Sequence, residues 1–480
     1  MQNLVTYKQK HIDIKDIHTK SNLHKTLLIN GWARTVRIQA TIAFIELYDG
    51  STSHTIQVIT EDPTLIEQLK SISVGSSISI TGTVIPHPQK EDRVEVLLTQ
   101  IHYIGKINDP MTYILNAKKT TLETFRDHQD IRAKTRTFNA VFRIRAGLSK
   151  ATHDFFYKKG FHHLNPNIVT TSDCEGGGEV FTITTLLDKT TTNIPQVDKT
   201  TTIDYTKDFF NKHAFLTVSS QLQLELLCAG LGKVWTSNKS FRSEKSKTNR
   251  HLAEFEHIEW ETAWTSLDEL MDQSEEYTQF AFNYVLTNHI DDLEELNKFT
   301  SKGIIDKLTS FTKTPYIRIT YDTAVELIMT HQDIIKQMYK LTTLPKWGDD
   351  LGSECEKYLA EFIFKHPLFV YNYPKELKSF YMMANPDNKT VQGCDLLIPG
   401  LGELIGSSVR EHDYDRLMAV VKQRNMDEKP LRWYLDLRLN GSTPTAGAGL
   451  GFDRLVRVCT GIENIRDAVP FPVAYQECRF

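Results

Sequence analysis

Cysteine is scarce in this sequence of 480 residues: there are six, and none belongs to a C-x-x-C pair. Disulfide frameworks and zinc ribbons need regularly spaced cysteines, so the sequence argues against both. It also lacks an apolar run of ~18 residues, the length that spans a membrane, and its first residues contain no apolar signal region. We therefore expect reduced thiols, no membrane contact and a cytoplasmic location. The cysteines are Cys174, Cys228, Cys355, Cys394, Cys459 and Cys478.

A surplus of positive charge is also missing, since the formal net charge at pH 7 is −4. Total charge therefore gives no indication of nucleic-acid binding, and any such surface must be a local one. The glycine patterns G-x-G-x-x-G and G-x-x-x-x-G-K-[ST] do not occur either. A dinucleotide fingerprint and a P-loop are thus excluded as the source of any nucleotide binding.

Short β-branched runs, five in number, occupy residues 23–105. Asp49 and Gly50 stand between two of them and are typical of a tight turn. Five such runs in about 80 residues favour a small closed barrel, and the OB-fold is the common five-stranded one. Residues 1–110 hold 11 basic and 11 acidic side chains. A nucleic-acid surface on this domain, residues 1–105, would therefore be one face of the barrel.

Residues 106–135 resemble a polar hinge. Basic residues outnumber acidic ones by 12 to five over 106–159. Two interpretations stay open, a solvated linker and a linker that touches a phosphate backbone. Apolar residues at helical spacing then predict a helix over 143–159, followed by a strand. Residues 136–480 mix strands and helices, with a helical insertion around 265–345.

The segment FRSEKSKTNRHLAEFEHIEWE, residues 241–261, carries two arginines, two histidines and five glutamates. From Arg250 onward the alternation is that of a strand, and a second strand precedes it, so we predict a hairpin. Arg242 and Glu244 would point to the same side, with Phe255 on the facing strand. A fixed cation, an acceptor and an aromatic ring suit a nucleotide, with phosphate on the arginine and the base on the ring. A solvated surface hairpin with cross-strand ion pairs is the alternative.

Glycines accompany charge in two further segments. In TPTAGAGLGFDRLVRV, residues 443–458, alternating glycines precede a helix that carries Arg454. Glycine in a strand permits close approach of a ligand, and the arginine suits an anionic one. In TTSDCEGGGEVF, residues 170–181, three glycines stand beside Glu175 and favour a loop that closes on something small. An ordinary surface arginine and a plain turn are the alternative interpretations.

The segment CDLLIPGLGELIGSSVRE, residues 394–411, places Asp395 and Glu403 at predicted strand ends. Mg²⁺ in proteins is often held by one or two carboxylates together with substrate phosphates. The pair is therefore a candidate magnesium site, although purely structural acids show the same spacing. Arg410, beyond the pair, is a candidate reader of an anion or an amide.

In their order along the chain, these segments resemble the class II aminoacyl-tRNA synthetases. FRSE…RHLAEFE resembles motif 2 of that family, GAGLGFDR resembles motif 3, and the helix 143–159 with its following strand resembles motif 1. The barrel resembles the anticodon-binding OB-fold of subclass IIb, which contains the aspartyl, asparaginyl and lysyl enzymes. The resemblance implies an α+β fold, in which an N-terminal OB-fold β-barrel precedes a class II catalytic domain with an antiparallel sheet flanked by helices.

Two departures from the family pattern lie in motifs 1 and 3, and a third is SSV, residues 407–409, where the family pattern GSQ is expected. Motif 1 has Asn167 where the family's proline would fall, with Pro166 just before it, and motif 3 has Asp453 where glutamate is usual. Neither of these two departures removes a catalytic charge that the resemblance implies.

The resemblance also implies roles for single residues. Arg242 is expected on the α-phosphate of ATP and Arg454 on the γ-phosphate, as the catalytic charges, and Phe255 is expected to stack on adenine. Asp395 and Glu403 correspond to the magnesium ligands. The implied ATP-binding residues are Arg242, Glu244, His251, Phe255, Glu403 and Arg454; the amino-acid-binding residues are Glu175, Gln221, Glu225 and Arg410; the anticodon-binding residues are Phe44 and Gln57.

Asparagine is the amino acid that the resemblance implies. Aspartyl enzymes carry a lysine in a QSPQ-x-x-K stretch, and Leu224 stands at that position in SSQLQLE, residues 219–225. Glu225 follows, as in the asparaginyl enzymes; it can accept from an amide and would repel a carboxylate. Arg410 can donate to the amide oxygen. An acceptor together with a donor fits asparagine better than aspartate.

The implied reaction is a two-step ligation that needs ATP and Mg²⁺. Asparagine is first activated to an aminoacyl-adenylate and then transferred to the 3′ end of tRNA(Asn), by an enzyme expected to be a homodimer. The alternatives are an aspartyl-tRNA synthetase of relaxed specificity and a non-catalytic tRNA-binding paralogue. The presence of Arg242, Arg454 and Glu403 favours an active enzyme.

Overall fold

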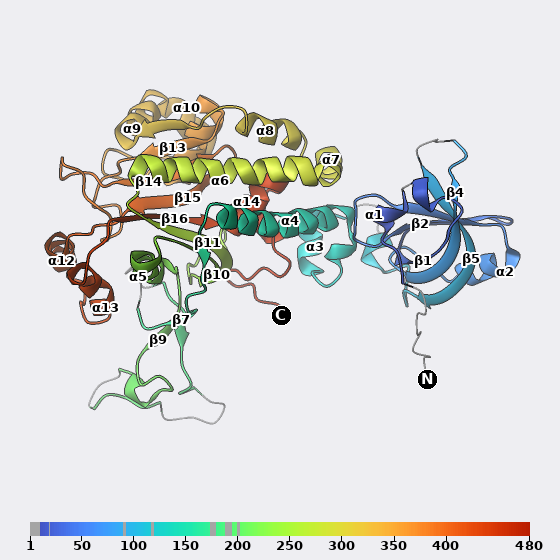
Figure 1. Ribbon diagram of the computed structural model, residues 1–480, viewed down its shortest axis with the longest axis horizontal. Coiled ribbons are helices and arrows are strands. Elements are labelled where there is room, and N and C mark those ends of the chain that lie inside the picture. Colours follow the sequence, from blue (N-terminus) through green and yellow to red (C-terminus); the bar gives the residue numbers. More distant parts are fainter. Residues whose placement is uncertain are drawn as a thin grey trace. The chain divides into compact units, whose positions relative to one another are not determined.

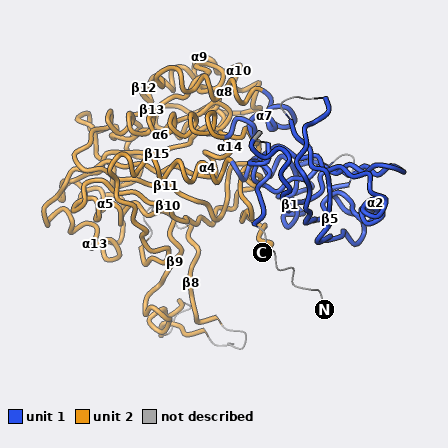
Figure 2. The backbone as a smooth tube through the Cα atoms, turned by 45° about the vertical axis from the view of Figure 1, so that its right-hand side comes forward, with its two compact units in different colours: residues 1–143, 289–302 blue, residues 144–288, 303–480 orange. Residues whose placement is uncertain are grey.

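The chain forms two compact units (Figure 2). Unit 1 comprises residues 1–143 and 289–302, and unit 2 comprises residues 144–288 and 303–480. The structure, a computed structural model, describes residues 10–18, 20–89, 93–116, 120–172, 179–187, 194–198 and 202–480. Within these ranges the helices are too short or too polar to cross a membrane. The five cysteines among them are all free thiols.

Unit 1 contains a closed barrel with the strand order β1-β2-β3-β5-β4 (Figure 1). Its strands are β1 (Thr26–Ile38), β2 (Ala43–Tyr48), β3 (Ile56–Thr60), β4 (Ser77–Pro86) and β5 (Val94–Gly105). β3 and β5 pair in parallel, and the other neighbours are antiparallel. Alternate aliphatic residues, such as Ile45 and Leu47, fill the interior because successive side chains point to opposite faces. The predicted five-stranded barrel is confirmed.

Unit 1 also contains short helices and helical turns. They are α1 (Ile14–Ile17), η1 (Lys20–Asn22), α2 (Pro63–Leu69), η2 (Ile114–Asn116), α3 (Leu122–Asp127), η3 (Arg132–Lys134), the start of α4 (Arg136–Lys158), and α7 (Ile290–Phe299). α7 belongs to this unit although it comes much later in the chain. Arg143 of α4 accounts for this: its Nη2 lies 2.6 Å from Asp292 Oδ1, and its Nη1 donates to the carbonyl of Gly50 at 3.1 Å.

Unit 2 is built on an eight-stranded sheet with the order β12-β13-β14-β15-β16-β11-β10-β6. Neighbours are antiparallel from β13 to β10, and the outer pairs β12–β13 and β10–β6 are parallel. A separate small sheet has the order β7-β9-β8. The strands are β6 (His162–His163), β7 (Val169–Thr170), β8 (Thr182–Ile183), β9 (Ala214–Leu216), β10 (Lys233–Phe241), β11 (Glu254–Ala263), β12 (Ile317–Thr320), β13 (Leu368–Tyr371), β14 (Gly393–Ile398), β15 (Gly402–Val409) and β16 (Thr445–Gly451).

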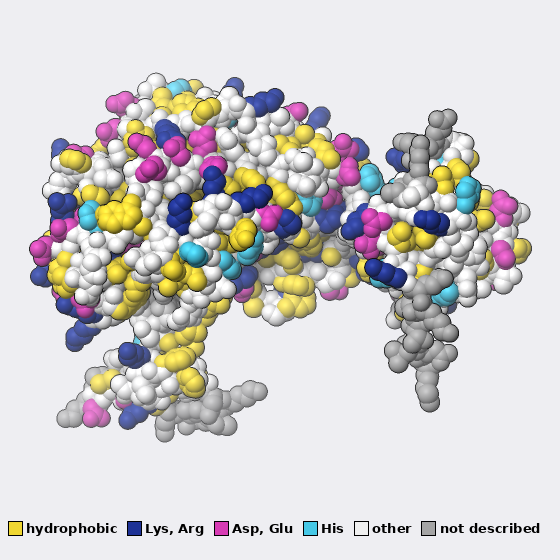
Figure 3. All heavy atoms as spheres, viewed as in Figure 1, with side chains coloured by type: hydrophobic (Ala, Val, Ile, Leu, Met, Phe, Trp, Pro, Cys, Tyr) yellow, Lys and Arg dark blue, Asp and Glu magenta, His cyan; other side chains and the backbone are white. Residues whose placement is uncertain are grey.

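Helices cover the large sheet and extend its edges. α6 packs against β14, β15 and β16, and α5 packs against β10, β11 and β16 (Figure 1). On the face of unit 2 seen in Figure 3, basic and acidic side chains are interspersed. The helices are α5 (Gln221–Leu231), α6 (Leu267–Asn288), α8 (Ile304–Phe311), α9 (Tyr321–Thr330), α10 (Gln332–Tyr339), α11 (Gly352–Tyr358), α12 (Tyr414–Gln423), α13 (Arg432–Leu435) and α14 (Phe452–Thr460), with single turns or short helices η4 (Tyr205–Lys207), η5 (Leu359–Phe364), η6 (Asp436–Leu439) and η7 (Ile465–Asp467).

The two faces of β11 have different neighbours. Trp260 contacts the rings of Phe156 in α4 and Tyr277 in α6, and Trp235 of β10 stacks on Phe156 with a centroid distance of 4.6 Å. This aromatic cluster belongs to the core between the sheet and the helices α4 and α6. Because strand side chains alternate, Phe255 and the residues at every second position after it face the opposite side, where the cavities described below lie.

Three predicted elements differ from the structure. α4 begins at Arg136, not at residue 143, because Thr135 Oγ1 accepts from the backbone N–H of Phe138 and ends the preceding polar stretch as an N-cap. The strand predicted after it is divided into β6 and β7, because Pro166 offers no N–H to a ladder. The helical insertion expected around residues 265–345 also contains a strand, β12, which lies at the edge of the eight-stranded sheet.

Candidate active site

The hairpin of β10 and β11 forms the middle of the site. The strands pair antiparallel, with Asn238 opposite His257 and Phe241 opposite Glu254. The alternation predicted that the second strand begins at Arg250, but β11 begins at Glu254. Just before it, the carbonyl of Ala253 still accepts from the N–H of Arg242 across the hairpin at 3.0 Å. The N–H of Ala253 instead donates to the carbonyl of Val473, outside the hairpin, at 2.8 Å.

Two cavities adjoin each other on this face of the sheet. The first, of about 300 Å³, contains Arg410 in its wall and is called the Arg410 cavity. The second, of about 240 Å³, contains Arg454 and is called the Arg454 cavity. They share Arg242, His257, Glu403 and Gly449 in their walls. A ligand could therefore extend from one cavity into the other past Arg242.

The Arg454 cavity brings together all six residues that were predicted for ATP. The guanidinium of Arg242 lies 5.5 Å from the centroid of the Phe255 ring. Arg454 Nη1 donates to the carbonyl of Glu403 at 3.0 Å and lies 3.5 Å from its carboxylate. The predicted residues in this wall are Arg242, Glu244, His251, Phe255, Glu403 and Arg454, and Arg250 joins them.

Glu403 lies among several cations. Burial alone would raise the pKa of its carboxyl, but Arg454, Lys378 and Arg242 outweigh burial and hold that pKa below the usual value. The carboxylate therefore stays charged at neutral pH. The wall holds three arginines, Arg242, Arg250 and Arg454, and three acids, Glu244, Glu403 and Asp453, of which Asp453 is paired with Arg145. Guanidinium groups gathered in one cavity suit the phosphates of a nucleotide.

The histidines of the site are neutral. Burial lowers the pKa of His251, and the nearby Arg250 and Arg454 lower it further against the opposing effect of Glu244. The Nε2 of His251 lies 4.0 Å from Glu244, and its Nδ1 is within hydrogen-bond distance of Ser246 and Thr248 hydroxyls. His251 can therefore accept or donate a hydrogen bond without adding charge to the cavity.

Asp395 and Glu403 lie on neighbouring strands, β14 and β15. Glu403 stands at the beginning of β15, as predicted, whereas Asp395 is the third residue of β14. A β-carbon at Gly406, which pairs with Asp395, would lie 3.1 Å from Glu403 Oε1 and 3.6 Å from Asp395 Oδ1. The two carboxylates therefore flank the open space above this glycine. Lys378 Nζ binds the other oxygen of Asp395 at 2.6 Å.

These carboxylates suit a magnesium ion that is also bound by phosphate. Within the described residues no group of three or more His, Cys, Asp or Glu side chains could hold a metal by itself. Two carboxylates beside a phosphate cavity are nevertheless a donor set that Mg²⁺ accepts, since it commonly binds one or two carboxylates plus substrate phosphates. A third acid, Glu356, lies nearby, and burial with the charges of Glu403 and Asp395 raises its pKa to about 7.

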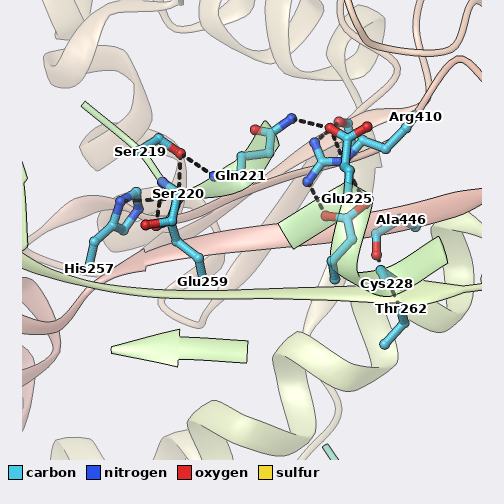
Figure 4. A network of polar contacts seen from close by, with 12 residues as sticks. Ser219, Ser220, Gln221, Glu225, Cys228, His257, Glu259, Thr262, Arg410 and Ala446 are labelled. Carbon is cyan, nitrogen blue, oxygen red and sulfur yellow. Dashed lines mark hydrogen bonds and ion pairs between the residues drawn. The ribbon is translucent and has the colours of Figure 1, made fainter. Parts of the chain in front are cut away.

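The Arg410 cavity has a buried ion pair in its wall (Figure 4). Arg410 binds Glu261 with two parallel hydrogen bonds of 3.0 and 2.8 Å, and its Nη1 donates to Ser408 Oγ at 2.7 Å. Burial alone would lower the pKa of Arg410, but Glu261 and Glu225 outweigh it and raise that pKa, so the guanidinium stays charged. Leu224 lines the same cavity and contributes no charge.

Glu225 is close to this cavity but is not part of its lining. Its side chain is 1 % exposed. Gln221 Nε2 donates to Glu225 Oε1 at 3.1 Å, and Arg410 Nε lies 3.8 Å from the same oxygen (Figure 4). Gln221 and Arg410 do line the cavity, so the structure brings these three predicted residues together.

The start of α5 is held by Glu259 of β11. Its carboxylate accepts from the backbone N–H of Ser220 at 2.9 Å and from the hydroxyl of Ser219 (Figure 4). Ser219 Oγ in turn accepts from the N–H of Gln221 at 3.1 Å. The hairpin therefore positions Gln221, the residue that meets Glu225 and the cavity.

The remaining predicted residues lie outside these cavities. Phe44 shares one face of β2 with Glu46, and Glu46 pairs with Gln57 of β3. Gln57 Nε2 donates to Glu95 at 2.6 Å and lines a cavity in unit 1. Glu175 lies outside the described residues.

Several residues of the site were not predicted from the sequence. Glu259 and Glu261 could have been found, because the alternation of the hairpin placed them on the same face as Phe255. Arg250 could also have been found, because it stands in the charged hairpin segment 241–261, whereas the others occur in segments to which the pattern analysis assigned no role, and folding brings them to the site. The residues in those segments are Glu356, Lys378 and Arg438.

Comparison with protein families matches almost the whole chain. Residues 122–475 match the family of class II tRNA synthetases (D, K and N), and residues 27–104 match the OB-fold nucleic acid binding domain. The asparagine–tRNA ligase of Cytophaga hutchinsonii is 42 % identical over 474 residues, which cover 98 % of this chain and 100 % of the relative. That of Protochlamydia amoebophila is 43 % identical over 448 residues, covering 93 % and 94 %.

Solved structures agree with these matches. The asparaginyl-tRNA synthetase of Pyrococcus horikoshii, in complex with asparaginyl-adenylate, superposes with a TM-score of 0.82 at 30 % identity, covering 97 % of this chain and 98 % of that one. The enzyme of Entamoeba histolytica superposes with a TM-score of 0.81 at 26 % identity, covering 98 % and 99 %. The family model matches most of the chain, and the relatives match it over nearly their full length. The chain therefore belongs to the class II tRNA synthetases of the D, K and N family.

Proposed function

We propose that this chain activates asparagine with ATP to an aminoacyl-adenylate and transfers it to the 3′ end of tRNA(Asn). The observation that carries the proposal is the meeting of two cavities at Arg242, one rich in arginine and one with a paired acceptor and donor. An adenylate has a nucleotide part and an amino-acid part joined at one phosphate, and it requires two adjoining cavities of these kinds. The relatives that match over nearly the full length are asparagine–tRNA ligases.

The Arg454 cavity is proposed to hold ATP. Phe255 offers a ring for adenine, with Arg242 beside it for the α-phosphate. Arg454 lies in the first turn of α14, within the same wall, and suits the γ-phosphate. Asp395 and Glu403 would hold Mg²⁺, which supplies neutralisation of phosphate charge when bound.

The Arg410 cavity is proposed to hold asparagine. Arg410 in the cavity wall is proposed to donate to the amide oxygen. Glu225, which lies behind Gln221 and Arg410 and does not line the cavity, is proposed as the acceptor for the amide NH₂. Leu224 lines the cavity, so no lysine is available there for a carboxylate. Buried polar groups that find no partner cost binding free energy, which is why such a site rejects the wrong side chain strongly.

The chemistry requires no protein nucleophile. A carboxylate oxygen of asparagine attacks the α-phosphorus of ATP and pyrophosphate leaves; the ribose hydroxyl at the 3′ end of the tRNA then attacks the activated carbonyl and AMP leaves. This chain's residues bind, orient and neutralise charge, with Arg242 at the phosphate that reacts. Glu175 is proposed for the α-amino group of asparagine, and Phe44 with Gln57 for the anticodon.

A homodimer is proposed as the active form. Motif 1, residues 143 onward, implies it through the family resemblance, and Tyr157 in that helix is 83 % exposed, which leaves an aromatic ring available for a second copy. Sedimentation velocity of the purified chain would test this. A single species with the mass of one chain, 55.1 kDa, would contradict it.

The alternatives are less well supported. An aspartyl enzyme of relaxed specificity would need a cation where Leu224 stands. A non-catalytic paralogue would have no reason to keep Arg242, Arg454 and Glu403 in one cavity. The asparagine ligase explains both cavities with the residues that are present.

The decisive experiment is amino-acid-dependent exchange between ATP and pyrophosphate, without tRNA, with asparagine, aspartate and lysine compared in the presence of Mg²⁺. We expect exchange with asparagine alone. Exchange with aspartate would keep the ATP cavity and overturn the proposed amino-acid specificity. No exchange with any of the three, from folded protein, would favour the non-catalytic paralogue.

A further inference from the structure

Two residues behind the Arg410 cavity, Tyr434 and Arg438, hold one side of Glu225. Glu225 Oε2 accepts from the Tyr434 hydroxyl at 2.7 Å and from Arg438 Nη2 at 2.8 Å. Its other oxygen, Oε1, accepts from Gln221 and lies toward Arg410, and both of these residues line the cavity. The two oxygens therefore have different tasks: Oε2 is bound from behind, and Oε1 keeps acceptor capacity on the cavity side.

Arg438 is itself held in one orientation. Its Nε donates to the carbonyl of Glu411 and its Nη1 to the carbonyl of Tyr434, both at 3.1 Å. Its guanidinium lies 4.1 Å from the centroid of the Tyr434 ring, and its side chain is 4 % exposed. Since the donors of a guanidinium form a rigid fork, these bonds determine where Nη2 points. Arg438 is not part of the cavity wall, so it acts through Glu225.

Charge is balanced in this buried cluster. Glu225 and Glu261 face Arg410 and Arg438, and all four side chains are at most 5 % exposed. A buried carboxylate that loses its cation becomes protonated, because burial penalises the charged form. A protonated Glu225 would offer an O–H and would no longer repel a substrate carboxylate. The titratable or charged groups around Glu225 are Cys228, Glu261, Arg410, Tyr434 and Arg438.

We propose that Arg438 and Tyr434 are positioning residues for amino-acid selection: they give Glu225 a buried cation and turn it so that Oε1 faces Gln221 and Arg410 in the cavity wall, where its charge disfavours a substrate carboxylate. The inference rests on the proposed function, since it takes asparagine as the substrate. It adds two residues on α13 and η6, outside the motifs of the family, that determine how strongly asparagine is preferred to aspartate.

The test is kcat/KM for pyrophosphate exchange with asparagine and with aspartate, measured between about pH 6 and about pH 9. In Arg438→Met we expect the asparagine-to-aspartate ratio to fall by about tenfold or more at the acid end and to recover toward the alkaline end, because Glu225 loses its proton there. In Tyr434→Phe, which removes one hydroxyl, we expect a fall of about threefold. The wild-type profile is the reference, because burial raises the pKa of Glu261 in the same cluster to about 7 and any pH dependence of the wild-type ratio belongs to that group.

Two further variants separate positioning from general damage. Arg438→Lys restores the charge without the fork, so it should recover part of the ratio and remove its dependence on pH. Arg432→Met is the matched control on α13, because Arg432 is half exposed and pairs with Asp436 on the surface. It should leave both substrates unchanged.

The outcomes are distinct. An equal loss of kcat/KM for both substrates at every pH, or an unchanged ratio in both Arg438→Met and Tyr434→Phe, would overturn the inference. The proposed function would still hold in that case, provided that the wild-type protein shows exchange with asparagine. Wild-type protein without asparagine exchange would overturn the proposed function itself. If Arg438→Met does not fold, the ratio and pH profile of Tyr434→Phe decide, since that change preserves shape.

Discussion

Arg242 is a cation that both cavities share, and its position next to Phe255 makes it the charge expected at the reacting phosphate. We expect Arg242→Ala to lower asparagine-dependent pyrophosphate exchange by about 10²–10³, the usual effect of removing one group that stabilises the transition state. The thermal unfolding midpoint should change little, because a cavity-lining cation adds little to the core.

Arg416→Ala provides the control for this change, since Arg416 is an exposed arginine on α12 in the same unit. It should retain full exchange. If Arg242→Ala kept exchange within about threefold of wild type, the proposed role in phosphate binding would be wrong.

His257 also lines both cavities, and its lowered pKa predicts that the stability of the protein depends on pH. Burial lowers the pKa of His257, Arg242 and Arg454 add to this effect, and Glu259 opposes it. The unfolded chain therefore binds a proton more readily than the folded one, so stability present above the ordinary histidine pKa is lost as the pH falls below it. His257→Gln should reduce the drop in unfolding midpoint between about pH 7.5 and about pH 5.5.

Differential scanning calorimetry at both pH values measures this effect, with the wild type as reference for the other histidines. An identical drop in variant and wild type would show that His257 titrates alike in the folded and unfolded states.

At the scale of single residues, the sequence predicted the charged residues that stand in the family motifs. It did not predict the residues elsewhere in the chain that form salt bridges with site residues. Arg242, Phe255 and Arg454 could be predicted because each stands in a motif of recognisable order. Lys378 and Arg438 could not, since a salt bridge to Asp395 or Glu225 depends on segments that are distant in sequence and adjacent only after folding.

Among the elements, β16 approaches β11 so closely that one position must be glycine. A β-carbon on Gly447 would lie 2.5 Å from the carbonyl oxygen of Trp260 and 2.6 Å from Arg410 Nη2, and it would overlap Glu261. Gly447→Ala should therefore lower the free energy of unfolding by about 1–3 kcal/mol, the cost of overpacking. It should also raise the KM for asparagine in pyrophosphate exchange by about tenfold, because the Arg410–Glu261 pair moves.

Gly230→Ala on α5 is the matched control, because a β-carbon there would meet no atom within 4 Å. In a helix this change should be neutral or stabilise by about 0.5–1 kcal/mol. A Gly447→Ala protein with the wild-type KM and stability would show that β11 and β16 can separate at no cost.

Helices and strands could be predicted from the sequence where a segment shows one clear periodic or compositional pattern. The alternation of the hairpin identified the face of β11 that lines the cavities, and five β-branched runs identified the barrel. The start of α4 was not predicted, since its first turn is polar and its N-cap, Thr135, resembles any other threonine in the hinge. β12 was missed because a four-residue edge strand is too short to show a period.

In the whole molecule, α7 belongs to unit 1 although its sequence neighbours belong to unit 2. The pair of Arg143 and Asp292, with side chains 17 % and 7 % exposed, ties α7 to α4. Asp292→Asn should leave the arginine without its carboxylate and speed amide hydrogen exchange over residues 290–299 by about tenfold or more, since losing a buried partner costs several kcal/mol.

Asp272→Asn is the control, because Asp272 is 68 % exposed in its pair with Arg318 and surface pairs add little. Exchange over 290–299 that is equally slow in Asp292→Asn and wild type would mean that apolar packing alone retains α7.

The sequence by itself determined the barrel, the hairpin and the order of the motifs, because alternation, turn residues and motif spacing are local properties of the chain. Only the tertiary structure decided that Arg438 and Tyr434 hold Glu225, that Lys378 binds Asp395, and that α7 joins unit 1. These contacts join residues far apart in sequence. Such contacts leave no periodic pattern in the sequence. They form because folding of the whole chain buries these charged groups, and a buried charge needs a partner within hydrogen-bond distance.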